Sequence, residues 1–186
     1  TNQDYFAIDS ESGVFVLADG MGGHNGGERA SELTIKTIAS FLKQSRELLL
    51  GRPKEDVAQV IHDAFVTANS VVLHDATADP RLRGMGSTAV SAWLMNDRLF
   101  VAGIGDSRCY LIRDGQIEQY TLDHTMAELM RSAFSDIEPS VAARSGHVLY
   151  RCIGDPSSKK GPEIRAIRSQ PGDIIVLTSD GVTNVV

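Results

Sequence analysis

Two stretches far apart in the chain share nearly the same pattern, an apolar run that ends in Asp-Gly. Residues 14–20 read VFVLADG and residues 174–181 read IIVLTSDG, so these runs end at Asp19 and Asp180. A third apolar run, residues 101–104, is followed by Gly105 and Asp106. Strands that are apolar on both faces lie inside a protein, and each would bring a carboxylate to its end. Buried carboxylates need a shared positive partner, either Arg and Lys side chains or divalent cations.

A single Asp-Gly pair is more often a turn than a binding site. Asp114-Gly115, between two alternating strands, predicts such a hairpin turn, and we assign it no function. At Asp19 the strand runs into a glycine-rich loop, residues 20–27, which is not the pattern of a tight hairpin. Clustered oxygen ligands favour hard ions such as Mg²⁺ or Mn²⁺ over zinc. We therefore interpret the strand ends as a metal site.

The remaining pattern predicts an α+β domain whose helices cover a largely antiparallel sheet system. The first two strands form a hairpin, and the first helix has Asn25 and Glu28 at capping-box spacing. Four later strands form a meander, a short helix and loop form a flap, and a final hairpin follows. The expected strands are 5–9, 13–18, 87–95, 99–104, 108–113, 116–121, 163–168 and 173–178; the helices are 28–44 and one through 57–72, and the flap is 126–147.

Composition excludes several classes of function. With 186 residues and a net charge of −6, the chain suits one domain that repels nucleic acid and anionic membranes, and it has no dense basic run. Its two cysteines, Cys109 and Cys152, indicate neither a disulfide framework nor a zinc site, so we expect reduced core thiols and a cytoplasmic protein. No apolar run is long enough to span a membrane. Because the chain opens without Met and stops soon after a strand, we expect an excerpt of a longer protein.

Other motifs have weaker support. Residues 105–109 nearly match a nucleophile elbow around Ser107, but the final Gly is missing and a strand follows. Residues 84–89 resemble a dinucleotide loop but also lead into a strand. His24 fits a ligand, a proton donor or a helix start, and His124 fits an anchor for the flap. Arg108 fits equally well an attraction for phosphate and an ion pair that orients a carboxylate.

Taken in order, the motifs resemble the metal-dependent protein phosphatases (PPM) of type 2C, especially the compact bacterial kind. The resemblance extends over essentially the whole chain. The matching stretches are residues 2–4, 19–24, 27–31, 86–89, 105–108, 123–125, 149–154 and 177–181.

The resemblance implies an α-β-β-α sandwich of two antiparallel sheets flanked by helices, with the C-terminal part missing. Residues 1–186 would be a single catalytic domain truncated at both ends. Its cofactors would be two Mn²⁺ or Mg²⁺ ions, with a third, weaker site. Asp19 would bridge the two ions, the Gly20 carbonyl would bind one and Asp180 the other, so Asp19 and Asp180 are the catalytic pair. Asp106 would help to hold the third ion, and Asp4 would orient bound waters.

The implied activity is hydrolysis of phosphoserine and phosphothreonine in proteins by a water that the two ions activate. Its partners would be phosphoprotein substrates in signalling linked to a Ser/Thr kinase, with no nucleic acid and no membrane. The alternative is a pseudophosphatase that binds a partner through the same fold. Gln3 stands where many members have Glu, and Met21 where animal relatives have His. The family's phosphate-binding Arg would lie before Thr1 and a further metal-binding Asp after Val186; substrate-binding residues stay unassigned.

Overall fold

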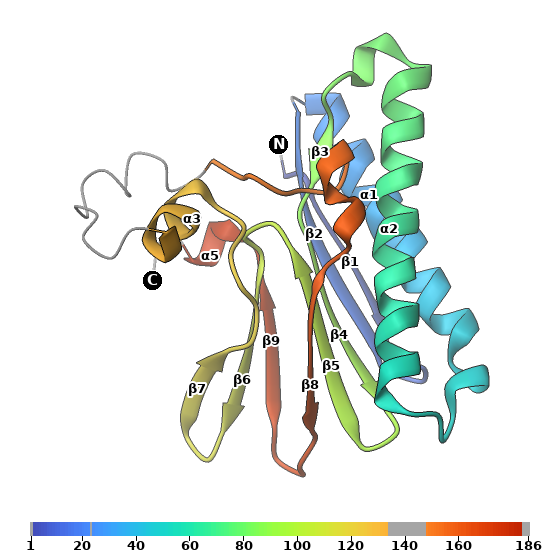
Figure 1. Ribbon diagram of the computed structural model, residues 1–186, viewed down its shortest axis with the longest axis vertical. Helices are drawn as coiled ribbons and strands as arrows, with labels where there is room; N and C mark the ends of the chain where they lie inside the picture. Colours follow the sequence, from blue (N-terminus) through green and yellow to red (C-terminus); the bar gives the residue numbers. More distant parts are fainter. Residues whose placement is uncertain (1, 23, 134–147, 184–186) are drawn as a thin grey trace.

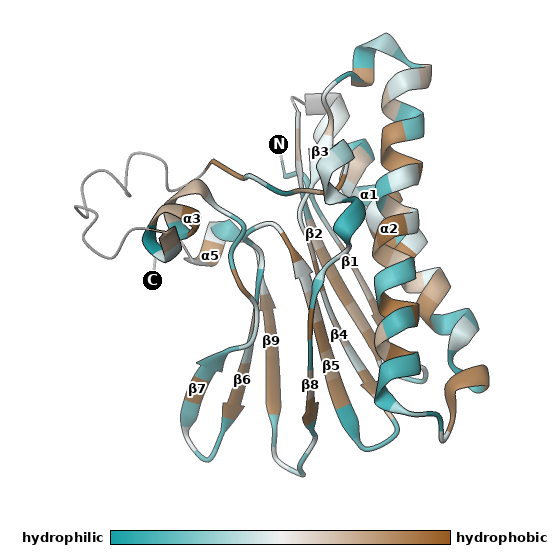
Figure 2. Cartoon of the chain, viewed as in Figure 1, coloured by the Kyte–Doolittle hydropathy of each residue, from teal (hydrophilic) through white to brown (hydrophobic). Residues whose placement is uncertain are grey.

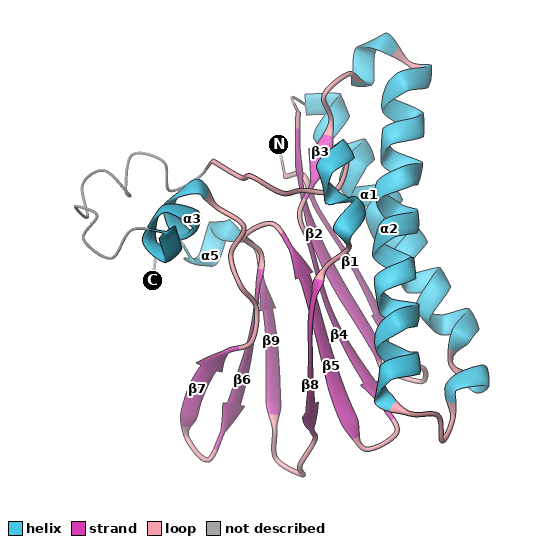
Figure 3. Cartoon of the chain, viewed as in Figure 1, coloured by secondary structure: helices cyan, strands magenta, loops and turns pink. Residues whose placement is uncertain are grey.

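The computed structural model describes residues 2–22, 24–133 and 148–183 (Figure 1). Two antiparallel sheets face each other, and helices α1 and α2 pack on the outer face of the larger sheet (Figures 1 and 3). The strands are β1 Asp4–Asp9, β2 Val14–Met21, β3 Gly86–Ser87, β4 Ala89–Met95, β5 Arg98–Ile104, β6 Arg108–Arg113, β7 Gln116–Gln119, β8 Glu163–Arg168 and β9 Ile174–Thr178. The helices are α1 His24–Ser45, α2 Lys54–Ala78, α3 Met126–Ala133 and α5 Asp180–Thr183, with 3₁₀ turns η1 Glu47–Leu49, η2 Pro80–Leu82 and η3 Pro156–Lys160.

The strand order confirms the predicted α+β sandwich of two antiparallel sheets. One sheet has the order β1-β2-β4-β5-β8, with β3 pairing with β2, and the other has the order β7-β6-β9. The predicted first hairpin is confirmed, and its register places Asp4 opposite Asp19. The Asp114-Gly115 turn between β6 and β7 is also confirmed, since both residues have positive φ angles, 52° and 76°. Both residues of a type I′ turn need positive φ angles.

The predicted meander and the predicted final hairpin are wrong. Strand β5 pairs with β4 and β8, whereas β6 pairs with β7 and β9, so the chain changes sheets between Ile104 and Arg108. Strands β8 and β9 likewise belong to different sheets. The alternating pattern reports which residues form strands but carries no information about which strand is the partner. The change of sheet places the corner that carries Asp106 at the junction of the two sheets.

Helix α1 begins at His24 rather than at Glu28, so the predicted capping box at Asn25 is wrong. Gly26 and Gly27, which were expected to lie in a loop, form part of the first helical turn. Packing explains their presence there: a Cβ atom on Gly27 would lie 2.5 Å from the Gln3 side-chain nitrogen, and one on Gly20 would overlap the Gly27 carbonyl. The start of α1 therefore lies directly against the strand end that carries Asp19. The second helix is confirmed and ends at Ala78, before Pro80.

The apolar core has two layers, because the larger sheet is covered on both faces. One face of β4, which includes Trp93, packs with α1 and α2, and Trp93 is fully buried. The other face, which includes Val90 and Ala92, packs with Leu177 of β9 and Cys109 of β6. Figure 2 shows hydrophobic bands along the facing strands and hydrophilic residues at the turns. Strand β9 is more exposed than predicted, since Ile174 retains 57% of its accessible surface.

Of the predicted flap, only the short helix is confirmed. Its first segment forms α3, whereas residues 134–147 lie outside the described residues. Helices α3 and α5 lie at one end of the three-stranded sheet (Figure 1). Within the described ranges, no helix has the length and apolar character needed to cross a membrane.

Candidate metal centre

The three carboxylates predicted from the strand ends meet in one cavity. Asp19 lies near the end of β2, Asp106 lies at the corner after β5, and Asp180 begins α5 directly after β9. The cavity has a volume of about 310 Å³. Its lining consists of Asp19, Gly20, Met21, Thr88, Asp106, Leu149, Cys152 and Asp180. Both sheets thus contribute acidic side chains to a single space.

A second, smaller cavity of about 210 Å³ shares two of these carboxylates. Asp19 and Asp180 line it together with Asp4, Asn2, Gln3, Ser179 and Gly181. The Ser179 hydroxyl donates a hydrogen bond of 3.2 Å to Asp4 Oδ2, which connects the end of β9 to the start of β1. Asp19 and Asp180 therefore stand between two adjoining spaces, and Asp4 faces only the second.

The acidic cluster has an electrostatic cost. Burial, together with the charges of Asp4 and Asp180, raises the pKa of Asp19 to about 7. Burial and the charge of Asp180 also raise the pKa of Asp106. Among the described residues, Asp4, Asp19 and Asp106 form no ion pair with Lys, Arg or His. A cation between these carboxylates would remove the repulsion, so the site has the electrostatic character of a metal centre.

The residues present fit hard divalent cations. In the described part of the chain, no three His, Cys, Asp or Glu side chains are gathered closely enough to ligate one ion among them. Mg²⁺ does not need such a cage, because it is held by one or two carboxylates and keeps several waters. Asp19 and Asp180, which line the cavity together with Gly20, provide that kind of oxygen donor set. Cys152 lines the same cavity, but burial raises the pKa of its thiol to about 11, which disfavours thiolate ligation of zinc.

A larger hollow lies elsewhere among the described residues. It has a volume of about 560 Å³, lies between β1, β2 and β9, and is lined mainly by apolar side chains such as Phe6, Phe15 and Leu177. None of the clustered carboxylates lines it. The volume of a cavity therefore does not identify the candidate site. The clustering of acidic side chains identifies it.

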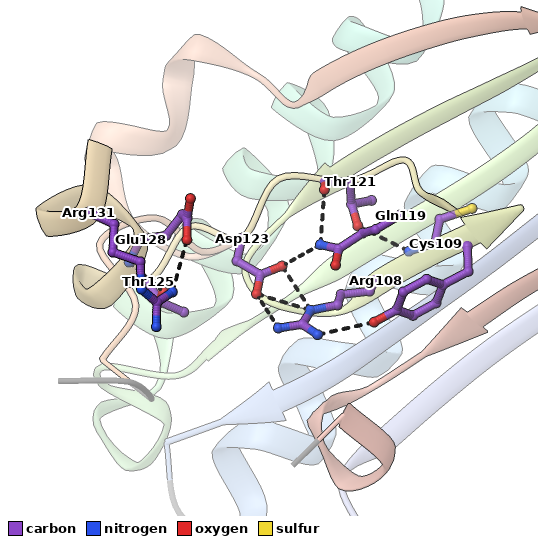
Figure 4. A network of polar contacts seen from close by, with 9 residues as sticks. Arg108, Cys109, Gln119, Thr121, Asp123, Thr125, Glu128 and Arg131 are labelled. Carbon is purple, nitrogen blue, oxygen red and sulfur yellow. Dashed lines mark hydrogen bonds and ion pairs between the residues drawn. The ribbon is translucent and has the colours of Figure 1, made fainter. Parts of the chain in front are cut away.

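The structure decides between the two interpretations of Arg108. Its guanidinium donates hydrogen bonds to both carboxylate oxygens of Asp123, at 2.6 to 3.1 Å, and one to the Tyr110 hydroxyl at 3.1 Å. The Gln119 amide donates a further bond of 3.0 Å to Asp123 (Figure 4). The side chains of Arg108 and Asp123 are 29% and 14% exposed. Arg108 is thus held in an ion pair behind the Asp106 corner, and the interpretation as a phosphate-attracting side chain is wrong.

We expect Arg108→Lys to lower the free energy of unfolding by about 1 to 2 kcal/mol, because Lys cannot bind a carboxylate with two parallel N–H groups. Urea denaturation would measure the change. The matched control is Arg131→Lys, since Arg131 pairs with Glu128 at 3.1 Å on the exposed side of α3. Exposed pairs contribute little, so this control should change by less than about 0.5 kcal/mol. Equal effects of the two substitutions would contradict a special role for the Arg108–Asp123 pair.

His124 is a buried structural residue. The ring nitrogen Nδ1 of His124 accepts a hydrogen bond of 3.1 Å from the backbone N–H of Gly105. The backbone N–H of His124 donates a hydrogen bond of 2.9 Å to the Gly105 carbonyl. Burial lowers the pKa of His124 to about 4, so the ring is neutral near pH 7. The following residue, Thr125, accepts a bond from the Glu128 N–H and caps α3 (Figure 4). These bonds support the predicted anchoring of the flap; the side chain of His24 lies outside the described residues.

The serine-hydrolase interpretation of Ser107 is wrong. Ser107 is 3% exposed, and its Oγ lies 2.7 Å from Thr88 Oγ1 rather than beside a histidine that acts as a base. A nucleophile must be accessible to its substrate and activated by a base. The sequence motif reflects only the tight corner before β6.

Sequence reasoning missed three contributors to the cavity, namely Thr88, Leu149 and Cys152. Cys152 was expected in the core, but it is only partly buried and lines the cavity with Leu149. Cys109 is a buried core thiol, as predicted, and both cysteines are free. Residues 149–154 belong to a recognisable motif, so the signal was present, but no local pattern connects that motif with Asp19.

A family model described as protein phosphatase 2C matches residues 1–186. The serine/threonine phosphatase stp of Listeria innocua is 29% identical over 186 residues, which cover 100% of this chain and 72% of that protein. Protein phosphatase PhpP of Streptococcus pneumoniae is 28% identical over 189 residues, which cover 100% of this chain and 74% of that protein.

Solved structures agree with these sequence relatives. The Mycobacterium tuberculosis serine/threonine phosphatase PstP/Ppp has a TM-score of 0.84 at 30% identity, with 100% of this chain and 75% of that chain covered. The catalytic domain of the serine/threonine protein phosphatase PstP in complex with two manganese ions has a TM-score of 0.80 at 30% identity, with 100% and 74% covered. The similarity therefore extends over every strand end that carries a clustered carboxylate.

Proposed function

Since the chain belongs to the protein phosphatase 2C family of serine/threonine phosphatases, we propose that it removes phosphate from phosphoserine and phosphothreonine in proteins at a centre of two Mn²⁺ or Mg²⁺ ions. Residues 1–186 would contribute one catalytic domain. The observation that carries the proposal is the meeting of Asp19, Asp106 and Asp180 in one cavity, with the pKa of Asp19 raised by burial and by its acidic neighbours.

Each residue has a distinct task in this proposal. Asp19 would be shared by the two ions; like Asp180, it lines both adjoining cavities. The Gly20 carbonyl would bind one ion and Asp180 the other. Asp106, which lines only the larger cavity, helps to hold a third and weaker ion. Asp4 faces the smaller cavity and is held by the Ser179 hydroxyl, which suits a residue that orients waters there.

Bound divalent cations would supply a lowered pKa for water and positive charge for the phosphoryl oxygens. The protein's contribution is to gather the carboxylates at one cavity and to hold their strand ends in place. The side chains of Met21, Leu149 and Cys152 form a less polar wall on the same cavity. Gln3 has no charge to offer, so the smaller cavity relies on Asp4, Asp19 and Asp180.

The leaving serine or threonine needs a proton. Met21, which lines the cavity, has none to give, and His124 is fully buried with Nδ1 bonded to the Gly105 N–H. We therefore propose that this proton comes from water in the cavity rather than from either of these side chains. In this proposal water attacks the phosphorus directly, so no phosphoenzyme forms, and the buried Ser107 takes no part.

The physiological substrates would be phosphoproteins modified by a Ser/Thr kinase in a signalling pathway. A cytoplasmic location, which the two free cysteines favour, stays a prediction. The alternative of a pseudophosphatase finds no support, because the carboxylates are gathered in one cavity and the relatives are named as phosphatases.

The full-length protein should release inorganic phosphate from a phosphothreonine peptide when Mn²⁺ is added. Excess EDTA should abolish the release, and added Mn²⁺ or Mg²⁺ should restore it, because the carboxylates alone cannot activate water. A phosphate-release assay with the peptide and the corresponding phosphoserine peptide would measure both activities. Phosphate release that continues at full rate in EDTA would refute the metal-centred proposal.

A further inference from the structure

Thr88 holds both backbone groups of Asp19. It lies in a one-residue break between β3 and β4. Its Oγ1 accepts a hydrogen bond of 2.9 Å from the Asp19 N–H, and its own N–H donates to the Asp19 carbonyl at 2.8 Å. The hydroxyl of the preceding residue, Ser87, lies 3.1 Å from the same carbonyl and shares its single proton with the Thr88 carbonyl at 2.7 Å. The strand end that presents the Asp19 carboxylate is therefore fixed by residues 87 and 88.

Thr88 also contacts the corner that carries Asp106. Its Oγ1 lies 2.7 Å from Ser107 Oγ, and both residues are 3% exposed. Because Thr88 Oγ1 accepts from the Asp19 N–H, its own proton is available for Ser107. The Thr88 methyl group packs against Gly105, where an added Cβ atom would lie only 2.7 Å from it. One side chain thus touches the backbone next to two of the clustered carboxylates.

The position of this contact is unusual within the sandwich. Asp19 and Thr88 belong to the six-stranded sheet, whereas Ser107 leads into β6 of the three-stranded sheet. Elsewhere among the described residues the facing sheets meet mainly through apolar side chains such as Val90, Leu177 and Cys109, with further polar contacts from Ser179 to Asp4 and from Arg113 to the Arg168 carbonyl. Apolar contacts are not directional, but a hydrogen bond constrains both distance and angle. Together with the Ser179–Asp4 bond, the Thr88–Ser107 bond therefore constrains the separation of the sheets at the end where the cations would bind.

We propose that Thr88 is a positioning residue that fixes the spacing between the Asp19 and Asp106 carboxylates by hydrogen-bonding to both corners. The proposal rests on the proposed function, since the spacing matters only for cations that both corners help to hold. Thr88 lines the cavity but is assigned no ligand role. Groups that orient metal ligands typically change metal affinity by about 10- to 100-fold when they are removed.

Isothermal titration of MnCl₂ into the full-length, metal-free protein tests the proposal without relying on activity. Thr88→Val removes the hydroxyl and keeps the shape, and Thr88→Ser keeps the hydroxyl. Ser107→Ala removes the bridge but leaves the Thr88–Asp19 bonds. The matched control is Thr34→Val in α1, because Thr34 is fully buried and its Oγ1 has no hydrogen-bond partner among the described residues.

We expect Thr88→Val to raise the dissociation constant for Mn²⁺ by about tenfold or more, and Ser107→Ala to raise it several-fold. The dissociation constants of Thr88→Ser and Thr34→Val for Mn²⁺ should stay within about twofold of the wild-type value. In phosphate release, the Mn²⁺ concentration for half-maximal rate should rise with the dissociation constant in Thr88→Val and stay unchanged in Thr34→Val.

The outcomes separate this inference from the proposed function. A wild-type protein that binds no Mn²⁺ would overturn the proposed function. A wild-type protein that binds Mn²⁺, with Thr88→Val binding as tightly as Thr34→Val, would overturn only the positioning role. If Thr88→Val does not fold, Ser107→Ala decides, and a dissociation constant equal to that of the wild type then overturns the role.

Discussion

Asp19→Asn should lower Mn²⁺-dependent phosphate release by at least about 1,000-fold, equivalent to about 4 kcal/mol of transition-state stabilisation. Asn preserves the size of the side chain but removes the negative charge from a residue that lines both cavities. We expect both cation sites to weaken together, because the neutral amide is a poor bridge between two ions. Initial rates with a phosphothreonine peptide at saturating Mn²⁺ would measure the loss.

The matched control for this experiment is Asp114→Asn. Asp114 occupies the β6–β7 turn with a φ of 52°, a conformation that Asn tolerates well. Its substitution should leave the rate within about twofold of the wild type, because a change at a surface turn remote from the reaction alters the barrier little. A rate for Asp19→Asn within tenfold of this control would exclude Asp19 as the bridging ligand.

Divalent cations should stabilise the folded protein strongly. At a free Mn²⁺ concentration 100 times the dissociation constant, binding to one site adds about 2.7 kcal/mol to the free energy of unfolding. For a chain of this size, each kcal/mol raises Tm by about 2 to 4 °C. Thermal denaturation should therefore show a rise in Tm of about 5 to 10 °C on addition of Mn²⁺. Asp19→Asn should lose most of this rise, and an equal rise in the variant would contradict the assignment.

The metal-free protein should also respond to pH through Asp19. The folded-state pKa of about 7 lies above the ordinary value of 3.8, so the folded state binds more protons between these limits. Stability from this group is therefore present at low pH and is lost as pH rises from about 4 to about 7. The full shift corresponds to about 4 kcal/mol. Because Asp19 is only about half-buried, solvent screening reduces the expected change to about 1 to 2 kcal/mol.

Other groups titrate in the same range, so the comparison must be made against Asp19→Asn. The raised pKa of Asp106 acts in the same direction as that of Asp19. His124 acts oppositely: its folded pKa of about 4 lies below 6.5, so its contribution is lost as pH falls through that window. Urea denaturation of the wild type and of Asp19→Asn in EDTA between pH 4.5 and 8 would measure the free energy of unfolding of each. The difference between the two curves is the contribution of Asp19. If the free energy of unfolding changed with pH in the same way in both proteins, the raised pKa of Asp19 would be contradicted.

The carboxylates at the site were predictable because each follows a local pattern. An apolar run that ends in Asp-Gly indicates a buried strand with an acidic end, and Asp19, Asp106 and Asp180 all meet in one cavity. The helices and strands themselves were also predictable, since hydrophobic periodicity depends only on neighbouring residues. The bridging and metal-binding roles of these residues stay predictions.

Which strands pair, and which distant residues contact each other, was not predictable in the same way. Nothing in residues 98–113 indicates that β5 pairs with β8 while β6 pairs with β9, and the expected meander was wrong for this reason. The start of α1 at His24 depended on Gly27 packing against Gly20 and Gln3. Arg108 fitted two roles until the structure placed Asp123 beside it. In each case the deciding group is distant in sequence.

The sequence by itself thus determined which residues end core strands in a carboxylate, and its ordered motifs indicated the family. Only the tertiary structure decided that the chain crosses between sheets at Asp106, that Cys152 lines the cavity, and that Thr88 hydrogen-bonds to the corners of both sheets. The physical reason is the range of the forces involved. Strand formation and turn chemistry act between near neighbours, whereas a metal centre depends on groups that long-range packing brings together.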